Sequence, residues 1–456
     1  MINSRMICLE CLIDILENNN HCHIVLNDTL KIYQYLDKKD RAFITRLCTG
    51  TVERKIELDY IINQFSKVKV NKMKPVIRNI LRMAVYQMKY MDTVPNRAAI
   101  NEAVNLANKK GFYTLKGFVN GVLRNIDRDL DNIEYPKKNS LEYYEVKYSM
   151  PKWIISKWFK EFGKDTTIKI LEAFLKDDTT TSVRCNTNII DVDDLAEQIS
   201  KEVTKVEKSS YCKEGLILSG YDYIGKMNSF NQGLFYVQDV SSMISVDAMG
   251  IKPNQYIIDV CAAPGGKAIT AALSLKKTGM VDARDISEKK VKYITDNIGR
   301  FGLENVSVKV HDALVEDESV IGKADIVIAD LPCSGLGVIG QKADIKYNAT
   351  KEKLSELVDL QRKMLSVVQK YVKPGGILLY STCTINRDEN LSNVKWFIDN
   401  FDFEMDSLKP YVSVNIKSDT VKKGYLQLLP GVHNTDGFFI ARMKKNELGL
   451  EIYGKK

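Results

Sequence analysis

The chain has 456 residues, of which 45% are hydrophobic and 27% are charged. At roughly 100–200 residues per domain, this length predicts two to four domains, each able to bury its own core. The composition excludes a mainly disordered, collagen-like or coiled-coil chain, and no apolar run has the length of a membrane span. Acids within the first apolar run argue against a signal peptide. Nine cysteines, an odd number without framework spacing, favour a reducing cytoplasm.

The positive charge is concentrated in the first third of the chain. Residues 1–150 hold 24 basic and 17 acidic residues, a net charge of +7 within a total of +8. Three basic residues, Lys74, Arg78 and Arg82, recur every four positions in a stretch without acids and therefore share one helical face. Such a face suits a polyanion, RNA above all, or it is a solvated face balanced by acids elsewhere in the fold.

Residues 1 to about 130 have the periodicity of a helical domain. Apolar residues recur at i, i+3 and i+4, and strand-like alternation is absent. The helical runs span 6–16, 41–65, 75–91, 97–108 and 117–126. We therefore predict an all-α domain over 1–130, followed by a polar linker at 127–140.

The next part of the chain mixes helical and strand-like patterns. Helices are predicted around Trp153 and Trp158, near 167–176 and near 191–201. Short strands are predicted near 180–187, 203–207 and 215–218. This mixture predicts a small α+β domain over 141–230.

From about residue 235, short apolar runs alternate with helical segments. The runs span 256–260, 279–284, 306–310, 325–330 and 375–382. Their length and their β-branched residues indicate buried parallel strands, and the alternation predicts a Rossmann-like, doubly wound α/β domain over 235–456. Two last runs, 426–431 and 437–443, are predicted to pair as an antiparallel hairpin.

Small and acidic residues follow these predicted strands, where an open α/β sheet binds its ligand. The first strand leads into a loop of small residues that lets a ligand approach the backbone: Cys261, Ala262, Ala263, Pro264, Gly265, Gly266 and Lys267. Asp285 follows the second strand, where a carboxylate can accept hydrogen bonds from ribose hydroxyls, and we prefer it to Asp282 because it lies at the strand end. Asp312 and Asp330 follow the next two strands. Any one of these acids equally well caps a helix, but the set favours a nucleoside ligand.

Two cysteines follow strands of the same predicted sheet. Cys333 lies in DLPCSG and Cys383 in STC, at a separation that allows one helical crossover between neighbouring strands. We therefore expect both thiols at one edge of the ligand crevice. A single free cysteine is more often a small buried hydrophobe, and a metal site would need further ligands, for which only His311 and His433 lie nearby in the sequence.

These motifs together resemble a known family. CAAPGGK, DLPCSG and STC look like the motifs of the S-adenosyl-L-methionine-dependent RNA cytosine-C5 methyltransferases, and the resemblance extends through 235–456, with VQDVSS at 237–242 and LPGVHNTDGFFIAR at 429–442. The segment 39–62 resembles the NusB-like helical RNA-binding domain that is fused to such enzymes of bacterial small-subunit (16S) ribosomal RNA. The middle domain is placed by its order along the chain.

The resemblance implies a catalytic scheme. Carbon 5 of cytosine is a poor nucleophile, and adding a thiolate to carbon 6 converts the ring into an enamine that can attack a methyl sulfonium. The family implies Cys383 as this nucleophile, Asp330 as the acid at ring nitrogen 3 and Cys333 as the group that assists product release. Cys333 is the rival for the nucleophile role, because DNA-type enzymes use the cysteine of their Pro-Cys motif.

The resemblance also implies the cofactor contacts. The loop 261–267 would lie against the methionine part, Asp285 on the ribose hydroxyls, Asp312 near the adenine amine, and Asp330 close to both cofactor and base. Lys267 would contact either the cofactor carboxylate or the target base. We expect a cytoplasmic monomer without a metal, whose helix with Lys74, Arg78 and Arg82 contacts RNA.

Two alternatives stay open. The same chemistry can act on transfer RNA, and a non-catalytic ribosome assembly factor would keep the RNA-binding domains without the reaction. The intact set of Asp330, Cys333 and Cys383 argues against the second alternative, since an inert binder needs none of them. The two extra domains and the basic helix argue against a small-molecule methyltransferase.

Overall fold

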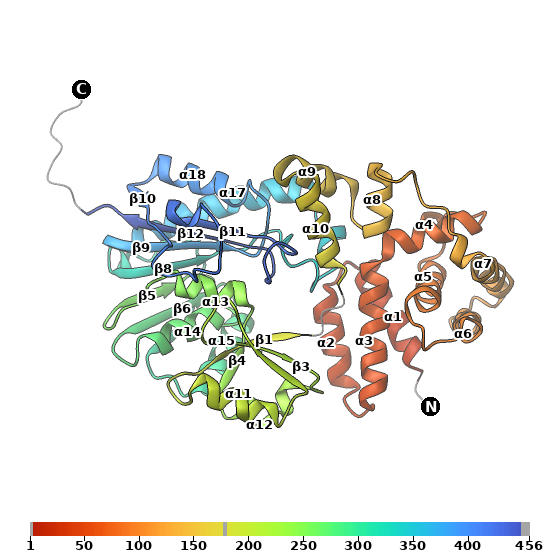
Figure 1. Cartoon of the computed structure of the whole chain (residues 1–456), viewed down its shortest axis with the longest axis horizontal. Coiled ribbons are helices and arrows are strands. Elements are labelled where there is room, and N and C mark those ends of the chain that lie inside the picture. Colours follow the sequence, from red (N-terminus) through yellow and green to blue (C-terminus); the bar gives the residue numbers. More distant parts are fainter. Residues whose placement is uncertain (1–2, 177–179, 448–456) are drawn as a thin grey trace. The chain divides into compact units, whose positions relative to one another are not determined.

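The computed structural model describes residues 3–176 and 180–447, which fall into two compact units (Figure 1). The first unit contains the chain up to Lys176 together with Ile339–Asn348, and the second contains the remainder. Within the described ranges, none of the helices combines the length and apolar character needed to cross a bilayer. Because this division is based on packing alone, it does not test the domain boundaries 1–130, 141–230 and 235–456, which remain predictions.

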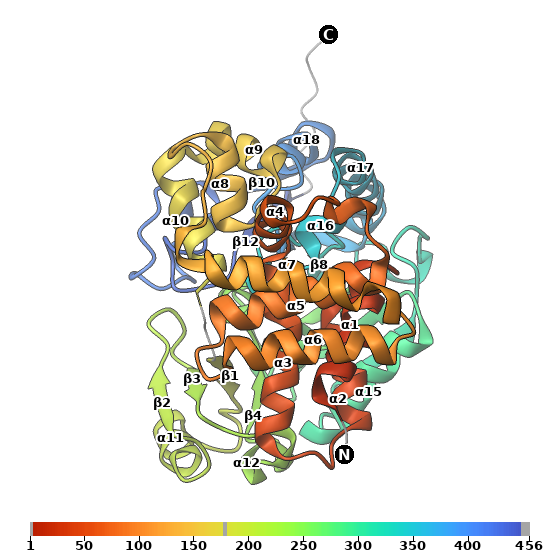
Figure 2. The same cartoon turned by 90° about the vertical axis from the view of Figure 1, so that its right-hand side faces the viewer.

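The N-terminal part of the first unit is helical, as the sequence predicts. The central helix is α5, because 11 of its 16 residues are buried and it packs against five other helices, of which α6 and α7 lie beside it in Figure 2. The elements are α1 (Ser4–Leu16), α2 (Cys22–Ile32), α3 (Lys38–Glu53), α4 (Lys55–Phe65), η1 (Val70–Lys72), α5 (Pro75–Tyr90), α6 (Asn96–Lys109), η2 (Tyr113–Leu115), α7 (Lys116–Arg128) and η3 (Leu130–Asn132), where η denotes a 3-10 helix.

Two details of this part differ from the prediction. The run predicted over 41–65 is two helices, because the backbone leaves the helical conformation at Arg54, with φ −95° and ψ 9°. Helix α2 is missing from the predicted set, since only Cys22 and Leu26 are buried in it and its apolar face is short.

The basic residues of α5 do not form a solvent-facing stripe. Arg82 is only 5% exposed, and its guanidinium donates to Asp59 at 2.6 Å from Nε and 2.8 Å from Nη2. Arg78 donates from Nε to Glu17 at 2.8 Å, while Lys74 is exposed. The predicted outer stripe is therefore wrong for Arg82, and both arginines are balanced by acids of neighbouring helices, because α5 lies too deep in the bundle to leave their charges unpaired.

Three helices and one turn complete the first unit: α8 (Leu141–Tyr148), α9 (Lys152–Phe162), α10 (Lys164–Phe174) and α16 (Ile345–Asn348). Lys346 of α16 is 1% exposed and donates from Nζ to the carbonyl oxygen of Glu53 at 2.8 Å. Burial lowers the pKa of Lys346 to about 7. A segment far along the chain is thus anchored to the end of α3 by a buried hydrogen bond.

Four of the nine cysteines lie in the helical core of this unit. They are buried and belong to one apolar cluster: Cys8, Cys11, Cys22 and Cys48. Cys8 and Cys11 form a Cys-x-x-Cys pair on α1, so the expectation of scattered cysteines is wrong for them. Across the described ranges, no group of three or more His, Cys, Asp or Glu side chains is arranged to hold a metal ion.

The second unit begins with a four-stranded antiparallel sheet in the order β2-β3-β1-β4. The predicted strands are confirmed, and β4 adds one that was not predicted. The elements are β1 (Thr181–Cys185), α11 (Val192–Ser200), β2 (Lys205–Lys208), β3 (Gly215–Ser219), η4 (Ile224–Lys226), α12 (Asn228–Asn231) and β4 (Phe235–Val237).

The larger sheet of this unit is the predicted doubly wound one. Its order is β10-β12-β9-β8-β5-β6-β7, with β11 paired to β12, and the contacts among β5 to β9 are parallel. The strands are β5 (Tyr256–Asp259), β6 (Met280–Asp285), β7 (Val306–Val310), β8 (Ala324–Asp330), β9 (Val372–Thr382), β10 (Phe403–Met405), β11 (Tyr425–Leu428) and β12 (Phe438–Lys445). The predicted C-terminal hairpin is confirmed, and β12 also pairs with β9.

Helices cover both faces of this sheet because alternate strand residues face opposite cores. Ile257 packs in one apolar cluster with α13 and α14, and Ile258 packs in another with α17 and α18. The remaining elements are α13 (Val240–Asp247), α14 (Gly266–Ser274), α15 (Glu288–Phe301), η5 (Glu318–Val320), α17 (Lys351–Val368), η6 (Gln369–Tyr371), α18 (Leu391–Asn400) and η7 (Val421–Lys423).

The strand order reverses direction at β5, which lies between β6 and β8. In an open α/β sheet a ligand binds at such a switch point, outside the carboxyl ends of the strands. We therefore expect the ligand to bind at the segments that follow Asp259 of β5 and Asp330 of β8.

Candidate active site

The loop between β5 and α14 leaves free space beside Gly266, where α14 begins. Gly265, at the N-cap of α14, has φ +109°, a conformation that favours glycine. A Cβ added at Gly266 would meet only Nε2 of Gln238, at 3.6 Å. The first N–H groups of α14 therefore face a space in which an anionic group can be bound.

Asp285 ties this loop to the end of β6. Its Oδ2 accepts a hydrogen bond from the backbone N–H of Ala263 at 3.0 Å, and its Oδ1 accepts one from Ile286 at 2.8 Å. Lys290 lies 3.1 Å from Oδ1. The carboxylate is thus fixed at the edge of the loop, as expected for a residue at the strand end.

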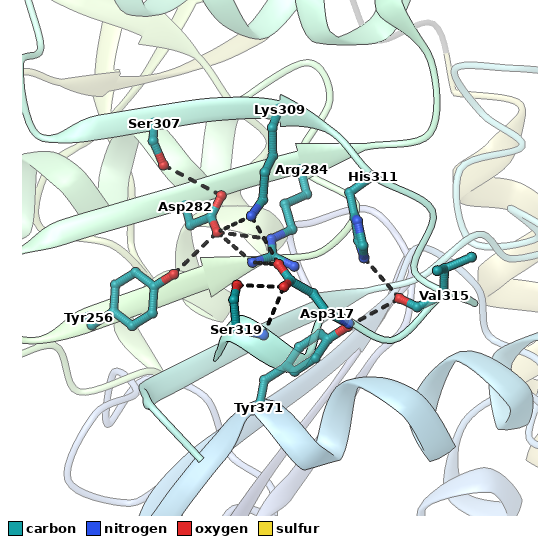
Figure 3. A network of polar contacts seen from close by, with 10 residues as sticks. All are labelled: Tyr256, Asp282, Arg284, Ser307, Lys309, His311, Val315, Asp317, Ser319 and Tyr371. Atoms are coloured by element: carbon teal, nitrogen blue, oxygen red, sulfur yellow. Dashed lines mark hydrogen bonds and ion pairs between the residues drawn. The ribbon is translucent and has the colours of Figure 1, made fainter. Parts of the chain in front are cut away.

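Asp282 points to the opposite face of the sheet, into the polar network of Figure 3. Its Oδ2 accepts from Nη2 of Arg284 at 2.6 Å and from the hydroxyl of Tyr256 at 3.2 Å. Arg284 also pairs with Asp317 at 3.1 Å, and Lys309 bridges the same two acids. This network holds Asp282 away from the crevice, so the geometry agrees with the choice of Asp285.

The same network fixes the loop that carries Asp312. The backbone N–H of Asp317 donates to the hydroxyl of Tyr371, which donates to the carbonyl oxygen of Val315, and His311 contacts that oxygen at 2.9 Å (Figure 3). Asp312 itself is half-buried and accepts from the N–H of Leu314 at 2.9 Å. The loop after β7 is thereby held in one conformation at the carboxyl end of its strand.

Asp259 is a site residue that the sequence prediction missed. It is 1% exposed at the end of β5, and burial, together with the nearby carboxylates of Asp330 and Asp285, raises its pKa to about 7. The only sequence signal was its place immediately before the loop of small residues. Asp259 is thus a third acid in this region, beside Asp285 and Asp330.

The raised pKa of Asp259 makes stability depend on pH. In the unfolded chain this carboxyl ionises near its ordinary value, whereas the fold disfavours its ionised form, so stability is lost as the pH rises toward and through about 7. We expect Asp259→Asn to melt about 5 °C higher than the wild type at pH 8 and at a similar temperature at pH 5. Thermal melts across this range measure the difference, with Asp296→Asn on exposed α15 as the control. Parallel curves for Asp259→Asn and wild type would contradict this assignment.

Gln238 is a second residue that the prediction missed, although it belongs to the VQDVSS motif. It is 6% exposed, and its Nε2 donates to the hydroxyl of Ser242 at 3.3 Å. Its Oε1 is buried and has no hydrogen-bond partner in the described part of the chain. An unpaired buried acceptor beside Gly266 is a group that a bound ligand with an N–H donor would satisfy.

The two cysteines meet as expected. Sγ of Cys333 lies 3.3 Å from Sγ of Cys383, and both side chains are partly exposed. Glycines bring their backbones together: Gly337 donates to the carbonyl oxygen of Cys383 at 3.1 Å and accepts from Gly437 at 2.9 Å. A Cβ at Gly337 would lie 2.0 Å from the oxygen of Gly437, so this approach requires glycine.

Glu389 holds the loop of Cys333 in place through hydrogen bonds to Ser334, the next residue. It is 0% exposed, and its carboxylate accepts from the backbone N–H of Ser334 at 2.8 Å, from its hydroxyl at 2.5 Å, from Asn386 at 2.9 Å and from Gln361 at 3.1 Å. Gln361 also donates to the carbonyl oxygen of Pro332 at 2.8 Å. Sequence reasoning missed this residue, because its donors Ser334 and Gln361 lie far from it along the chain.

Lys267 pairs with Asp330 across the crevice. Its Nζ lies 2.6 Å from Oδ2 of Asp330, whose Oδ1 accepts from the hydroxyl of Ser381 at 2.8 Å. Asp330 is in register with Ser381, two residues before Cys383. The carboxylate of Asp330 raises the pKa of Lys267 against the effect of burial, and Cys383 adds to this rise. Lys267 thus presents a charged ammonium between the acid and the thiol.

The two thiols share one hydrogen bond, in which either sulfur can be the donor. This hydrogen bond and burial raise the pKa of Cys333 well above the ordinary value of a thiol, so Cys333 stays a neutral thiol. The charge of Cys383 acts on the ammonium of Lys267. Burial also raises the pKa of Cys261, so that residue stays a neutral thiol in the loop.

These groups fit S-adenosyl-L-methionine. The carboxylates of Asp259, Asp285 and Asp330 favour the cationic sulfonium and ammonium, and the N-terminus of α14 favours the carboxylate. A doubly wound parallel sheet with a small-residue loop after its first strand and acids after the following strands defines a Rossmann-like methyltransferase.

Comparisons with known proteins agree with this class. The family model of the 16S rRNA methyltransferase RsmB/F matches residues 246–444, the NusB family matches 2–128, and the RsmF/B-like ferredoxin-like domain matches 150–222. The probable ribosomal RNA small subunit methyltransferase B of Bacillus subtilis is 35% identical over 97% of this chain and 98% of that protein. The protein of the same name from Synechocystis is 30% identical over 98% of this chain and 100% of that protein.

A solved methyltransferase homologue from Pyrococcus horikoshii is 30% identical and superposes with a TM-score of 0.57, covering 68% of this chain and 100% of that one. The chain therefore belongs to the 16S rRNA methyltransferase RsmB/F family and is an S-adenosyl-L-methionine-dependent methyltransferase.

Proposed function

We propose that this protein methylates carbon 5 of a cytosine in small-subunit ribosomal RNA through a covalent bond between Cys383 and carbon 6. The observation that carries the proposal is the 3.3 Å contact between the thiols of Cys333 and Cys383, next to the ion pair of Lys267 and Asp330. The names of the full-length relatives support ribosomal RNA as the substrate.

The cofactor would be held by the loop 261–267 and the acids around it, and when bound it supplies the methyl group. We assign its carboxylate to the N-terminus of α14, its ribose hydroxyls to Asp285 and its adenine amine to Asp312. The buried Asp259 and the partly exposed Asp330 lie close enough for the charge of Asp330 to raise the pKa of Asp259, and a positive charge is favoured beside them.

The first half of the reaction adds the thiolate of Cys383 to the ring. As the bond between Sγ and carbon 6 forms, the electrons of the 5,6 double bond shift to form a double bond between carbons 4 and 5. The π electrons of the double bond between carbon 4 and nitrogen 3 move onto nitrogen 3, which takes a proton from the pair of Lys267 and Asp330. The thiol of Cys333 and the ammonium of Lys267 both favour the thiolate of Cys383.

The second half restores the aromatic ring. The π electrons of the double bond between carbons 4 and 5 form the bond from carbon 5 to the methyl group, the lone pair of nitrogen 3 restores the double bond to carbon 4, and carbon 5 still carries its hydrogen. A water molecule removes this proton, the 5,6 double bond forms again, and the bond between Sγ and carbon 6 breaks with its electrons returning to sulfur. Nitrogen 3 returns its proton to Asp330, and the S–H of Cys333 stabilises the leaving thiolate of Cys383.

The decisive test uses Cys333→Ala. This variant lacks the hydrogen bond to the leaving thiolate, so we expect a covalent adduct between Cys383 and RNA to accumulate, with turnover at least about 10²-fold slower. The adduct is detected as a slow band on a denaturing gel and located by mass spectrometry. The double variant Cys333→Ala, Cys383→Ala is the control and must form no adduct. Normal turnover without an adduct would overturn the release role of Cys333.

The target is tested separately. Bisulfite sequencing of ribosomal and transfer RNA, from cells with and without this gene, reveals the nucleotide that loses 5-methylcytosine. Loss in small-subunit ribosomal RNA supports the proposal. Loss in transfer RNA alone would show that the same reaction acts on transfer RNA. No loss in either RNA would favour a non-catalytic assembly factor.

A further inference from the structure

The first unit contains a pocket of about 530 Å³ that lies outside the candidate active site. It opens where the end of α5 and the segment at Tyr135 meet α8 and α10. Its walls carry four tyrosines: Tyr90, Tyr135, Tyr143 and Tyr148. A volume of this size is typical of small-ligand sites, which are lined mainly by apolar and aromatic side chains.

A buried carboxylate fixes two of these rings. Glu57 is 3% exposed and accepts a hydrogen bond at 2.5 Å from the hydroxyl of Tyr90 and another at 2.5 Å from the hydroxyl of Tyr135. Its charge, together with burial, raises the pKa of both tyrosines, so their hydroxyls stay protonated and keep donating. The rings are therefore held in place before any ligand enters, which lowers the entropic cost of binding one.

Three cations border the same pocket. The guanidinium of Arg54 lies 4.7 Å from the ring centre of Tyr90 and 3.5 Å from Glu57. Lys89 lies 5.7 Å from the rings of Tyr90 and Tyr135. Lys147 is exposed and lies between Tyr143, at 5.6 Å, and Tyr148, at 5.1 Å. With Glu57 and Glu172 as the acids of the wall, the pocket has a net positive charge.

We propose that this pocket binds one unstacked nucleotide of single-stranded RNA, with its base against the tyrosine rings and its phosphate at Lys147. Aromatic faces bordered by cations are how proteins hold single-stranded nucleic acid, because every base offers a face to stack and every linkage offers a negative charge. The carboxylate of Glu172, which accepts one hydrogen bond from Tyr148 at 3.1 Å, can accept another from a base amine.

The proposal rests on RNA as the substrate of the proposed function, and it replaces the predicted role of α5. Arg78 and Arg82 of that helix are neutralised by Glu17 and Asp59, so they offer little to a phosphate. The inferred RNA contact of the first unit is therefore the pocket at the C-terminal end of α5, and no longer the face of α5 that carries Arg78 and Arg82.

The test compares the full-length variants Tyr143→Leu and Lys147→Gln with wild type. The probe is a short fluorescein-labelled single-stranded RNA of mixed sequence, and binding is measured by anisotropy at several salt concentrations. We expect about 10-fold weaker binding for Tyr143→Leu, because a stacking face is lost. For Lys147→Gln we expect weaker binding and a salt slope smaller by about one. Tyr113→Leu and Lys116→Gln, exposed on the same unit, are the matched controls and should bind as wild type.

A second measurement locates the base directly. The same RNA containing 4-thiouridine is crosslinked to the wild-type protein by light, and the crosslinked peptide is identified by mass spectrometry. We expect crosslinks in 135–148, and their loss in Tyr143→Leu. Unchanged binding in both variants, or crosslinks only in other segments, would overturn the proposal. Equal displacement of the RNA by poly-glutamate, with the same dependence on Lys147, would assign the pocket to an acidic protein segment instead.

Neither measurement uses methyl transfer. If the RNA binds at the pocket but no 5-methylcytosine forms, the proposed function fails and this inference stands. If methylation proceeds normally while the pocket variants bind RNA like wild type, this inference fails alone.

Discussion

Cys383→Ser is expected to lower methyl transfer to RNA by at least about 10³-fold while leaving cofactor binding near that of wild type. A serine hydroxyl keeps the size of the side chain but is not ionised near neutral pH, so carbon 6 of the cytosine receives no nucleophile. Transfer of a radiolabelled methyl group measures the rate, and calorimetric titration with S-adenosyl-L-methionine measures binding. The contact of Cys383 with Cys333, and the electrostatic interaction of Cys383 with Lys267, are the structural basis of this expectation.

The control for this variant is Cys212→Ser, the same chemical change at a buried cysteine of the second unit. It should retain methyl transfer, which separates the loss of a nucleophile from the general cost of a buried hydroxyl. If Cys383→Ser kept its turnover and Cys333→Ser lost both turnover and adduct formation, the nucleophile would be Cys333, the rival that the sequence left open.

Asp330→Asn is expected to slow methyl transfer by about 10²- to 10⁴-fold. Asparagine cannot exchange a proton with nitrogen 3 of the cytosine, and it removes the charge that holds Lys267 at 2.6 Å. Single-turnover rates with saturating RNA and cofactor measure the chemical step. Because the lost group handles a proton, the pH profile of the variant should differ from that of wild type, an effect that a purely structural role would not produce.

The matched control lies at the other end of the same strand. Asp325 is the second residue of β8, pairs with Lys373 and accepts from the backbone N–H of Tyr256 at 2.8 Å. Asp325→Asn preserves that hydrogen bond and should leave the rate within about twofold of wild type, since Asp325 lies at the end of the strand opposite to Asp330. Equal rates for Asp330→Asn and Asp325→Asn would remove Asp330 from the reaction.

Most of the candidate site was predictable because it follows directly from strand order. Parallel strands end at one edge of a sheet, so the segments after β5, β6, β8 and β9 had to meet there once their apolar runs were recognised. The two thiols, the loop 261–267 and Asp285 were expected at this edge on that ground, and the motifs extended the expectation to a family. Asp285 was chosen over Asp282 because it lies at the end of its strand, where the ligand binds.

The tertiary structure alone decided which charges are available. Arg78 and Arg82 have the spacing of a basic stripe, yet Glu17 and Asp59 neutralise them, and a helix's own sequence does not show which acids its neighbours bring. Asp259 acquires its raised pKa only because burial removes it from water next to two other acids. Glu389 supports the loop of Cys333 through donors from three segments.

The sequence by itself determined the periodic elements, their succession along the chain and the residues at their ends, because these depend on neighbours along the chain. The pairing of Cys333 with Cys383, the ion pair of Lys267 with Asp330 and the tyrosine pocket around Glu57 depend on distances between segments far apart in sequence. Protonation, hydrogen bonding and stacking are set by such distances and by burial, which only the packed fold specifies.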